Sequence, residues 1–155
     1  VLPAIALTKE LLPALKKALK DDRQVLMEKG VDKAREIVCG IIGNKEISDV
    51  SVCGEVIIKG KHEFYDYNAK YIDDNGMELK IPAEIKSALS KKIQDYTKSI
   101  FNSFGCYGFA RVDYFIDRRT QRVYFCEINT IPGFTSHSLF PSLFKNSGME
   151  LKEQI

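Results

Sequence analysis

Four polar residues on two nearby segments are of types that could do chemistry together. Arg111 and Asp113 are two apart, and so are Glu127 and Asn129. On a β-strand, residues two apart share a face. If the segments pair with Asp113 opposite Glu127, all four side chains converge, whereas a pairing shifted by one residue places the two sets on opposite faces.

Two carboxylates and one amide oxygen form an all-oxygen ligand set beside an arginine. Mg²⁺ or Mn²⁺ suits such ligands, and Mg²⁺ commonly completes its octahedron with water and nucleotide phosphates. The alternative is a solvent-facing sheet on which Arg111 pairs with an acidic residue across the strands. The spacing alone favours this second, structural interpretation, because ion pairs are common on sheets.

The segment after Asn129 favours a catalytic interpretation of these residues over the structural one. Residues 130–138 read T-I-P-G-F-T-S-H-S. A glycine between a proline and small hydroxyl residues offers backbone N–H groups to a developing oxyanion. The alternative is an ordinary Pro-Gly turn, with Ser138 capping the helix that follows.

The elements that must position these residues follow from the spacing of apolar residues. The clearest helix is predicted over 82–104, where Gly105 can end it. Residues 107–116 and 122–129 are predicted strands of a hairpin. Strands and helices mix without regular βαβ alternation, so we predict an α+β fold with a largely antiparallel sheet packed with helices, in one compact unit. The other predicted elements are a helix over 8–20 that becomes regular near Pro13, strands over 24–29, 35–43 and 50–59, a loop over 62–71, a turn over 73–76 and a helix over 138–145.

Composition narrows the classes of protein. Of 155 residues, 45% are hydrophobic and 28% charged, which is typical of a globular chain rather than a disordered one. The formal net charge of +2 does not favour nucleic acid as a partner. No apolar run approaches the roughly 20 residues of a membrane span. The four cysteines are scattered without a C-x-x-C motif, which argues against a zinc site and indicates a reducing cytoplasm.

Three ordered motifs give the sequence a specific signature. They are F-Y-D-Y-N-A-K-Y at 64–71, G-F-A-R-V-D at 108–113 and E-I-N-T-I-P-G-F-T-S-H-S-L at 127–139. Together they resemble the D-alanine–D-alanine ligase family of ATP-grasp enzymes, and looser similarity covers nearly the whole chain. The resemblance implies one ATP-grasp domain over residues 1–155, which forms half of the ATP-grasp fold. It also implies that ATP phosphorylates one D-alanine and the amine of a second D-alanine attacks the acyl phosphate, a step in making peptidoglycan precursors.

The resemblance also implies the partners and a role for each motif residue. ATP, Mg²⁺ (or Mn²⁺) and D-alanine are the expected cofactors and substrates, with no nucleic-acid or membrane partner, and the full-length family enzyme can be a homodimer. The residues around the reacting atoms are Asp113, Glu127 and Asn129 as metal ligands, Arg111 for the charge of the transferred phosphoryl group, the Gly133 N–H in an oxyanion hole, and the Ser138 side chain and Leu139 N–H for the carboxylate of the second D-alanine.

A second set of residues corresponds to family positions around the nucleotide. Tyr71 matches a tyrosine in the mobile loop over the active site, which favours D-alanine over a hydroxy acid. Without the resemblance, Val31 reads as core, and Glu28 and Glu36 read as surface acids. The nucleotide set is Glu28 for the adenine amino group, Lys29 and Val31 for backbone contacts, Glu36 for the ribose hydroxyls, Phe64 and Cys126 for the walls of the adenine slot, and Lys70 for a phosphate.

The sequence departs from the family pattern at its start. Leu2 stands where the family has a lysine, and the glycine- and serine-rich phosphate loop is missing. We therefore expect a domain truncated at its start, which keeps the metal hairpin but ligates D-alanine poorly or not at all by itself. The alternatives are a module that binds Mg-ATP without catalysis, which has no need of Arg111 and the Pro-Gly loop, and an ATP-grasp ligase for another carboxylate and amine.

Overall fold

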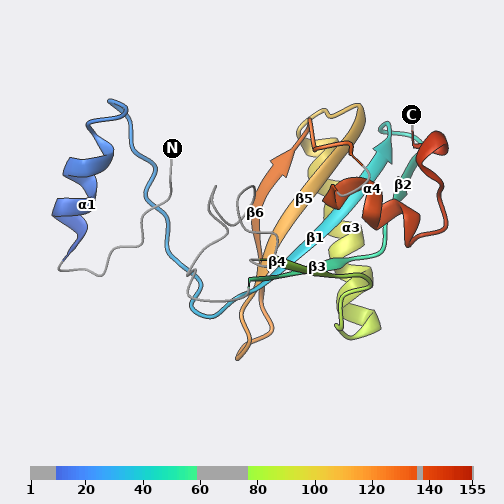
Figure 1. Ribbon diagram of the computed structural model, residues 1–155, viewed down its shortest axis with the longest axis horizontal. Coiled ribbons are helices and arrows are strands. Elements are labelled where there is room, and N and C mark those ends of the chain that lie inside the picture. The colour runs from blue at the N-terminus through green and yellow to red at the C-terminus, as the bar shows by residue number, and fades with distance from the viewer. Residues whose placement is uncertain (1–9, 59–76, 136–137, 155) are drawn as a thin grey trace. The chain divides into compact units, whose positions relative to one another are not determined.

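The computed structural model describes residues 10–58, 77–135 and 138–154 (Figure 1). The chain divides into two compact units. The first unit comprises Val1–Asp32 and Ile58–Met77, and the second comprises Lys33–Ile57 and Glu78–Ile155. The predicted loop at 62–71 and turn at 73–76 lie outside the described residues.

The described part of the first unit contains one helix, α1, at Leu11–Ala18. Pro13 lies in its first turn, where a missing N–H costs no intrahelical hydrogen bond. The strand predicted over 24–29 is wrong, because this segment is irregular. Its apolar residues Leu26 and Met27 are exposed, and alternation without a partner strand does not make a strand.

The second unit is built around a six-stranded sheet in the order β4-β3-β1-β5-β6, with β2 also paired to β1. The pairs of β1 with β2, β3 and β5, and of β5 with β6, are all antiparallel. The predicted α+β class with a largely antiparallel sheet is therefore confirmed. The strands are β1 (Arg35–Gly43), β2 (Ser48–Val50), β3 (Gly54–Ile58), β4 (Met77–Lys80), β5 (Gly108–Ile116) and β6 (Val123–Asn129).

The strand predicted over 50–59 is interrupted near its start. Ile41 pairs with Val50, and Val38 pairs with Gly54, so three residues oppose two on β1. In this irregularity the buried Ser51 hydroxyl accepts the Gly40 N–H at 2.8 Å and donates to the Val52 carbonyl. A side-chain hydroxyl thus replaces a backbone acceptor of the ladder.

Helix α3 (Ser87–Ser103) covers one face of the sheet, and α4 (Leu139–Lys145) lies on the other (Figure 1). Ile93 of α3 packs in the main core cluster with residues of β1 and β5, among them Ile37, Val112 and Tyr114. α3 begins five residues later than predicted, and Gly105, with φ of +63°, follows its end as expected. A short 3₁₀ helix at Leu151–Glu153 follows α4.

Two glycines of the sheet allow α4 to approach closely. A Cβ at Gly40 would lie 2.7 Å from Phe144 Cε2, and a Cβ at Gly54 would lie 2.8 Å from Leu143 Cδ2. Phe140, Leu143 and Phe144 are all buried. The helix that begins after Ser138 is therefore seated on the face of the sheet that carries Val38 and Gly40.

Candidate active site

The pairing of β5 with β6 has the register on which convergence depends. Asp113 lies opposite Glu127, and Arg111 lies opposite Asn129. Directly opposed residues on antiparallel strands have Cβ atoms about 4.5–5.5 Å apart. The four polar side chains therefore share one face of the hairpin, close enough for the two carboxylates to approach a single cation.

A bulge limits this arrangement to the end of the hairpin. After the pair Asp113 and Glu127, the next pair is Tyr114 with Phe125, which leaves Cys126 as the extra residue of β6. Beyond the bulge Phe125 shares the face of Tyr114, where its ring contacts Phe104 at a centroid distance of 6.3 Å. The bulge lets β6 present Glu127 to one face and Phe125 to the other.

Arg111 holds Asp113 through two parallel hydrogen bonds. Arg111 Nε donates to Asp113 Oδ1 and Nη2 donates to Oδ2, each at 2.7 Å. Both side chains are 8% exposed, whereas that of Glu127 is 57% exposed. Glu127 Oε1 lies 3.9 Å from Arg111 Nη2. The site is thus a buried bidentate ion pair with a second, accessible carboxylate at its rim.

The loop after β6 starts with a turn made by Asn129. The Oδ1 atom of Asn129 accepts the Ile131 N–H at 3.0 Å. This bond fixes the amide oxygen, one of the three predicted metal ligands, and leaves it a second lone pair for a cation. Pro132 is buried and Gly133 is exposed, so the proline anchors the loop and the glycine backbone faces solvent.

Ser138 lies against the Pro-Gly loop. Its Oγ accepts the Thr135 N–H at 3.0 Å and is hydrogen-bonded to Thr135 Oγ1 at 2.8 Å. A Cβ at Gly133 would lie 2.9 Å from Ser138 Oγ, so a side chain at this position would have to displace the Ser138 hydroxyl. The residues expected to contact an oxyanion and a substrate carboxylate are therefore direct neighbours.

An aromatic cluster fastens this loop to the sheet. The Phe134 ring lies 5.5 Å from that of Phe109 and 5.4 Å from that of Phe140, between centroids. Phe109 is on the same strand and face as Arg111. Sequence reasoning missed this cluster and Thr135. The spacing of Phe109 two residues before Arg111 was the available signal for the first, and the T-x-x-S spacing was the signal for the second.

The described residues contain no group of three or more His, Cys, Asp and Glu side chains that could hold a metal ion. The hairpin offers two carboxylates and one amide oxygen instead. Such a set fits Mg²⁺ or Mn²⁺ only where water and phosphate oxygens supply the remaining ligands.

The other predicted site residues divide into three groups, and the first group consists of Glu36 and Cys126 in the second unit. Glu36, half-buried on β1, shares the sheet face of Asp113, because Val38 lies opposite Asp113. Cys126 is the exposed residue of the bulge. The last two groups are Glu28, Lys29 and Val31, in an irregular segment of the first unit, and Phe64, Lys70 and Tyr71, outside the described residues.

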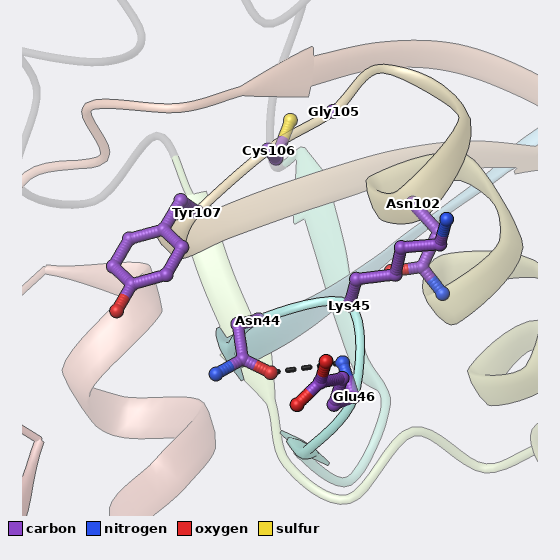
Figure 2. Close-up of a pocket in the computed structure, with 7 residues that line it drawn as sticks. All are labelled: Asn44, Lys45, Glu46, Asn102, Gly105, Cys106 and Tyr107. Carbon is purple, nitrogen blue, oxygen red and sulfur yellow. Dashed lines mark hydrogen bonds between the residues drawn. The ribbon is translucent and has the colours of Figure 1, made fainter.

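A hollow of about 400 Å³ lies elsewhere in the second unit (Figure 2). It is lined by the turn after β1 and by the link between α3 and β5, and Asn44 Oδ1 accepts the Glu46 N–H in that turn. None of the predicted site residues within the described ranges is among the residues that line it. The candidate active site therefore lies on the face of the sheet that also carries α4, and not in this cavity.

Among the helices that the structure describes, none combines the length and the hydrophobicity of a membrane-spanning segment.

Comparison with known proteins gives a consistent result. The family model described as "D-ala D-ala ligase C-terminus" matches residues 2–155. A D-alanine–D-alanine ligase of Prochlorococcus marinus (strain AS9601) is 43% identical over 146 residues, which are 94% of this chain and 39% of the relative. The chain thus spans about two fifths of the length of this curated relative.

Two solved structures share the fold. The VanG D-Ala:D-Ser ligase from Enterococcus faecalis has a TM-score of 0.77 and 27% identity, covering 96% of this chain and 41% of that one. The D-alanine–D-alanine ligase from Bacillus anthracis, solved in complex with ATP, has a TM-score of 0.74 and 27% identity, covering 97% of this chain and 46% of that one.

Proposed function

The chain belongs to the D-alanine–D-alanine ligase family, as part of its C-terminal region, and on that premise we propose that it carries the phosphoryl-transfer half of a ligase active site. In the complete reaction, a carboxylate oxygen of one D-alanine attacks the γ-phosphorus of ATP and ADP leaves. The amine of a second D-alanine then attacks the acyl phosphate carbon and phosphate leaves. The single observation that carries this proposal is the hairpin register that gathers Arg111, Asp113, Glu127 and Asn129 on one face.

Asp113, Glu127 and Asn129 would hold Mg²⁺ or Mn²⁺. A divalent ion in this position neutralises the charge of the nucleotide phosphates and orients them. The protein contributes two negative charges and one neutral oxygen, a set that leaves coordination positions for phosphate. The exposed Glu127 is the ligand that a metal-bound nucleotide meets first, because Asp113 lies deeper.

Arg111 is placed to act on the transferred phosphoryl group. Its planar guanidinium is always charged and presents a fork of donors that matches phosphate oxygens. Its burial strengthens each contact, since charge interactions grow as water is excluded.

The Pro-Gly loop and α4 serve the amino-acid substrates in this proposal. The Gly133 N–H stabilises the oxyanion of the tetrahedral intermediate, while the Ser138 hydroxyl and the Leu139 N–H hold the carboxylate of the second D-alanine. Support comes from the contact of Ser138 with the loop and from the aromatic cluster that fixes both to the sheet. Tyr71 covers the site in this proposal and favours an amine over a hydroxyl nucleophile.

The adenine, the ribose and one phosphate of the nucleotide are assigned to the other predicted residues. Both units belong to one ATP-grasp domain in this proposal, which the family match across residues 2–155 supports. The set is Glu28, Lys29, Val31, Glu36, Phe64, Lys70 and Cys126, in the roles given above. A cytoplasmic place of action, where ATP and free D-alanine are available, is part of the same proposal.

A calorimetric titration with ATP in the presence of Mg²⁺ tests the metal hairpin. The chain should bind saturably, and Glu127→Gln should weaken binding by about tenfold or more because a charged ligand is lost. Glu46→Gln, in the exposed turn after β1, is the matched control and should bind like the wild type. Equal affinities for Glu127→Gln and the wild type would contradict the assignment.

Phosphate release tests the chemistry. Because Leu2 cannot neutralise phosphate, the 155-residue chain should release no phosphate in response to D-alanine, D-serine or D-lactate. With Leu2→Lys and the phosphate loop of a longer family member restored, and joined to the remaining sequence of that member, it should respond to D-alanine. A longer enzyme that binds ATP through Glu127 but never turns over would favour the alternative of a non-catalytic Mg-ATP module.

A further inference from the structure

The two oxygens of Asp113 already have a cationic partner. The Arg111 guanidinium engages Oδ1 and Oδ2 together, at 2.7 Å each, in a setting from which water is largely excluded. The same Nη2 atom lies 3.9 Å from Glu127 Oε1. The positive charge of Arg111 therefore occupies the position that the charge of a divalent cation between the two carboxylates would take.

A metal ion and this guanidinium compete for the same carboxylate. A cation that approached Asp113 while the pair stayed intact would lie within a few ångströms of the Arg111 charge, and like charges repel strongly at low dielectric. Each Asp113 oxygen keeps a second lone pair beside its hydrogen bond to Arg111. Because an ion bound there would still face the guanidinium charge, we expect its binding to make the fork release at least one oxygen. That release leaves the buried guanidinium without its bidentate partner unless another anion accepts it, and breaking a buried ion pair is costly.

We propose that Arg111 is an internal counter-ion that keeps divalent metal off the hairpin until nucleotide phosphates accept its guanidinium. The phosphate oxygens take over the two donors, Asp113 is released, and the metal takes the place of the arginine charge. Metal and nucleotide then bind with positive coupling, because each removes the cost that the other would meet alone. This inference rests on the proposed function and adds an order to the assembly of that site.

A second arginine–carboxylate pair in the same sheet provides an internal comparison. Arg35 Nε and Nη2 donate to the two oxygens of Glu55 at 2.7 and 2.6 Å. Glu55, however, lies opposite Ile37, and the other acceptor of Arg35 Nη2 is the neutral Glu84 carbonyl at 2.9 Å. Removing Arg35 therefore releases one carboxylate with no second carboxylate opposite it on β1. The geometry therefore predicts that release of Asp113 creates a metal site and release of Glu55 does not.

The test measures binding of Mn²⁺ alone to the nucleotide-free chain, from the loss of the electron paramagnetic resonance signal of free Mn²⁺. Arg111→Met should bind Mn²⁺ about tenfold or more tightly than the wild type, because a close positive charge is gone. Arg119→Met, which removes the same charge from the exposed hairpin turn, should stay within about twofold because screening weakens distant charges. Arg35→Met should stay within the same limit. Adding Asp113→Asn to Arg111→Met should abolish the gain.

Equal Mn²⁺ affinities for Arg111→Met and the wild type, or an equal gain in Arg119→Met, would overturn the proposal. If circular dichroism shows that Arg111→Met is unfolded, Arg111→Gln decides, since glutamine removes the charge but keeps a side chain that can donate a hydrogen bond to Asp113. It should bind Mn²⁺ more tightly than the wild type, and no gain in it would overturn the proposal. The proposed function is tested separately by calorimetry, where unchanged ATP binding in Glu127→Gln would contradict it.

Discussion

The seating of α4 on the sheet depends on the absence of a side chain at Gly40. In Gly40→Ala the new Cβ would lie 2.7 Å from Phe144 Cε2 and 3.3 Å from Phe140 Cε2. Nonbonded carbons prefer separations of about 3.5–4.0 Å, so the closer pair must separate by roughly 1 Å. Phe144 is buried and packed against Phe140 at a centroid distance of 5.1 Å, so the ring cannot turn away freely. We expect α4, and with it Ser138, to shift away from the sheet.

The magnitude follows from the cost of overpacking a core, which is about 1–3 kcal/mol. A loss of about 2 kcal/mol in a chain of this size lowers the melting temperature by about 4–8 °C. Gly30→Ala is the control, because a Cβ there meets no heavy atom within 4 Å. It should change the free energy of unfolding by no more than about 0.5 kcal/mol.

A double-mutant cycle in urea identifies the contact responsible. Leucine at position 144 lacks the ring atom that meets the new Cβ, so Phe144→Leu should relieve part of the cost of Gly40→Ala. The double variant should be more stable than the sum of the two single losses by about 0.5 kcal/mol or more. A Gly40→Ala protein that melts within 1 °C (~0.3 kcal/mol) of the wild type, or strictly additive losses, would refute the reasoning.

Three further predictions concern other described parts of the second unit. Ser51→Ala should cost about 1–3 kcal/mol in urea unfolding, because the buried Gly40 N–H loses its acceptor, while the exposed Ser99→Ala should cost little. Burial raises the pKa of Tyr114, so its contribution to stability should hold up to about pH 10 and fall as the pH rises further. In Tyr114→Phe the free energy of unfolding should fall less steeply above about pH 10 than in the wild type, and an equally steep fall would contradict this prediction. Hydrogen bonds from the Thr120 and Arg119 N–H groups lower the pKa of Asp117, so its stabilising effect should be present above about pH 4 and be lost as the pH falls further. The melting temperature of Asp117→Asn should therefore change less than that of the wild type between about pH 3 and about pH 6.

The hairpin could be predicted from the sequence because its signals are local. Alternating residues defined both strands, and the expected segments 107–116 and 122–129 differ by one residue at their starts from β5 and β6. The register was the undecided quantity, since one shift would have reversed the faces. The structure has the pairing of Asp113 with Glu127, and a bulge at Cys126 confines that pairing to the functional end, a feature that no alternation pattern reveals.

Tertiary contacts explain the predictions that failed. The segment 24–29 alternates like a strand, but its apolar side chains remain exposed, and no strand pairs with it within the described ranges. The apolar stripe over 82–104 suggested a longer helix than α3, yet Ala83 donates to the Cys53 carbonyl and the Glu84 carbonyl accepts from Arg35. These backbone groups bond to the sheet instead of to a helical turn, so the helix begins at Ser87.

The ion pair that first favoured a structural interpretation of Arg111 does not exclude a functional one. A surface pair is worth little and needs no burial, but Arg111 and Asp113 are both largely withdrawn from water, at a desolvation cost that two hydrogen bonds must offset. The charges of Arg111 and Asp113 already cancel, so this pair does not by itself explain why the carboxylate of Glu127 lies at its rim. A second carboxylate beside a satisfied pair is explained if the arginine is a partner that leaves. The structural and functional interpretations then describe two states of the same four residues, one before and one after phosphate arrives.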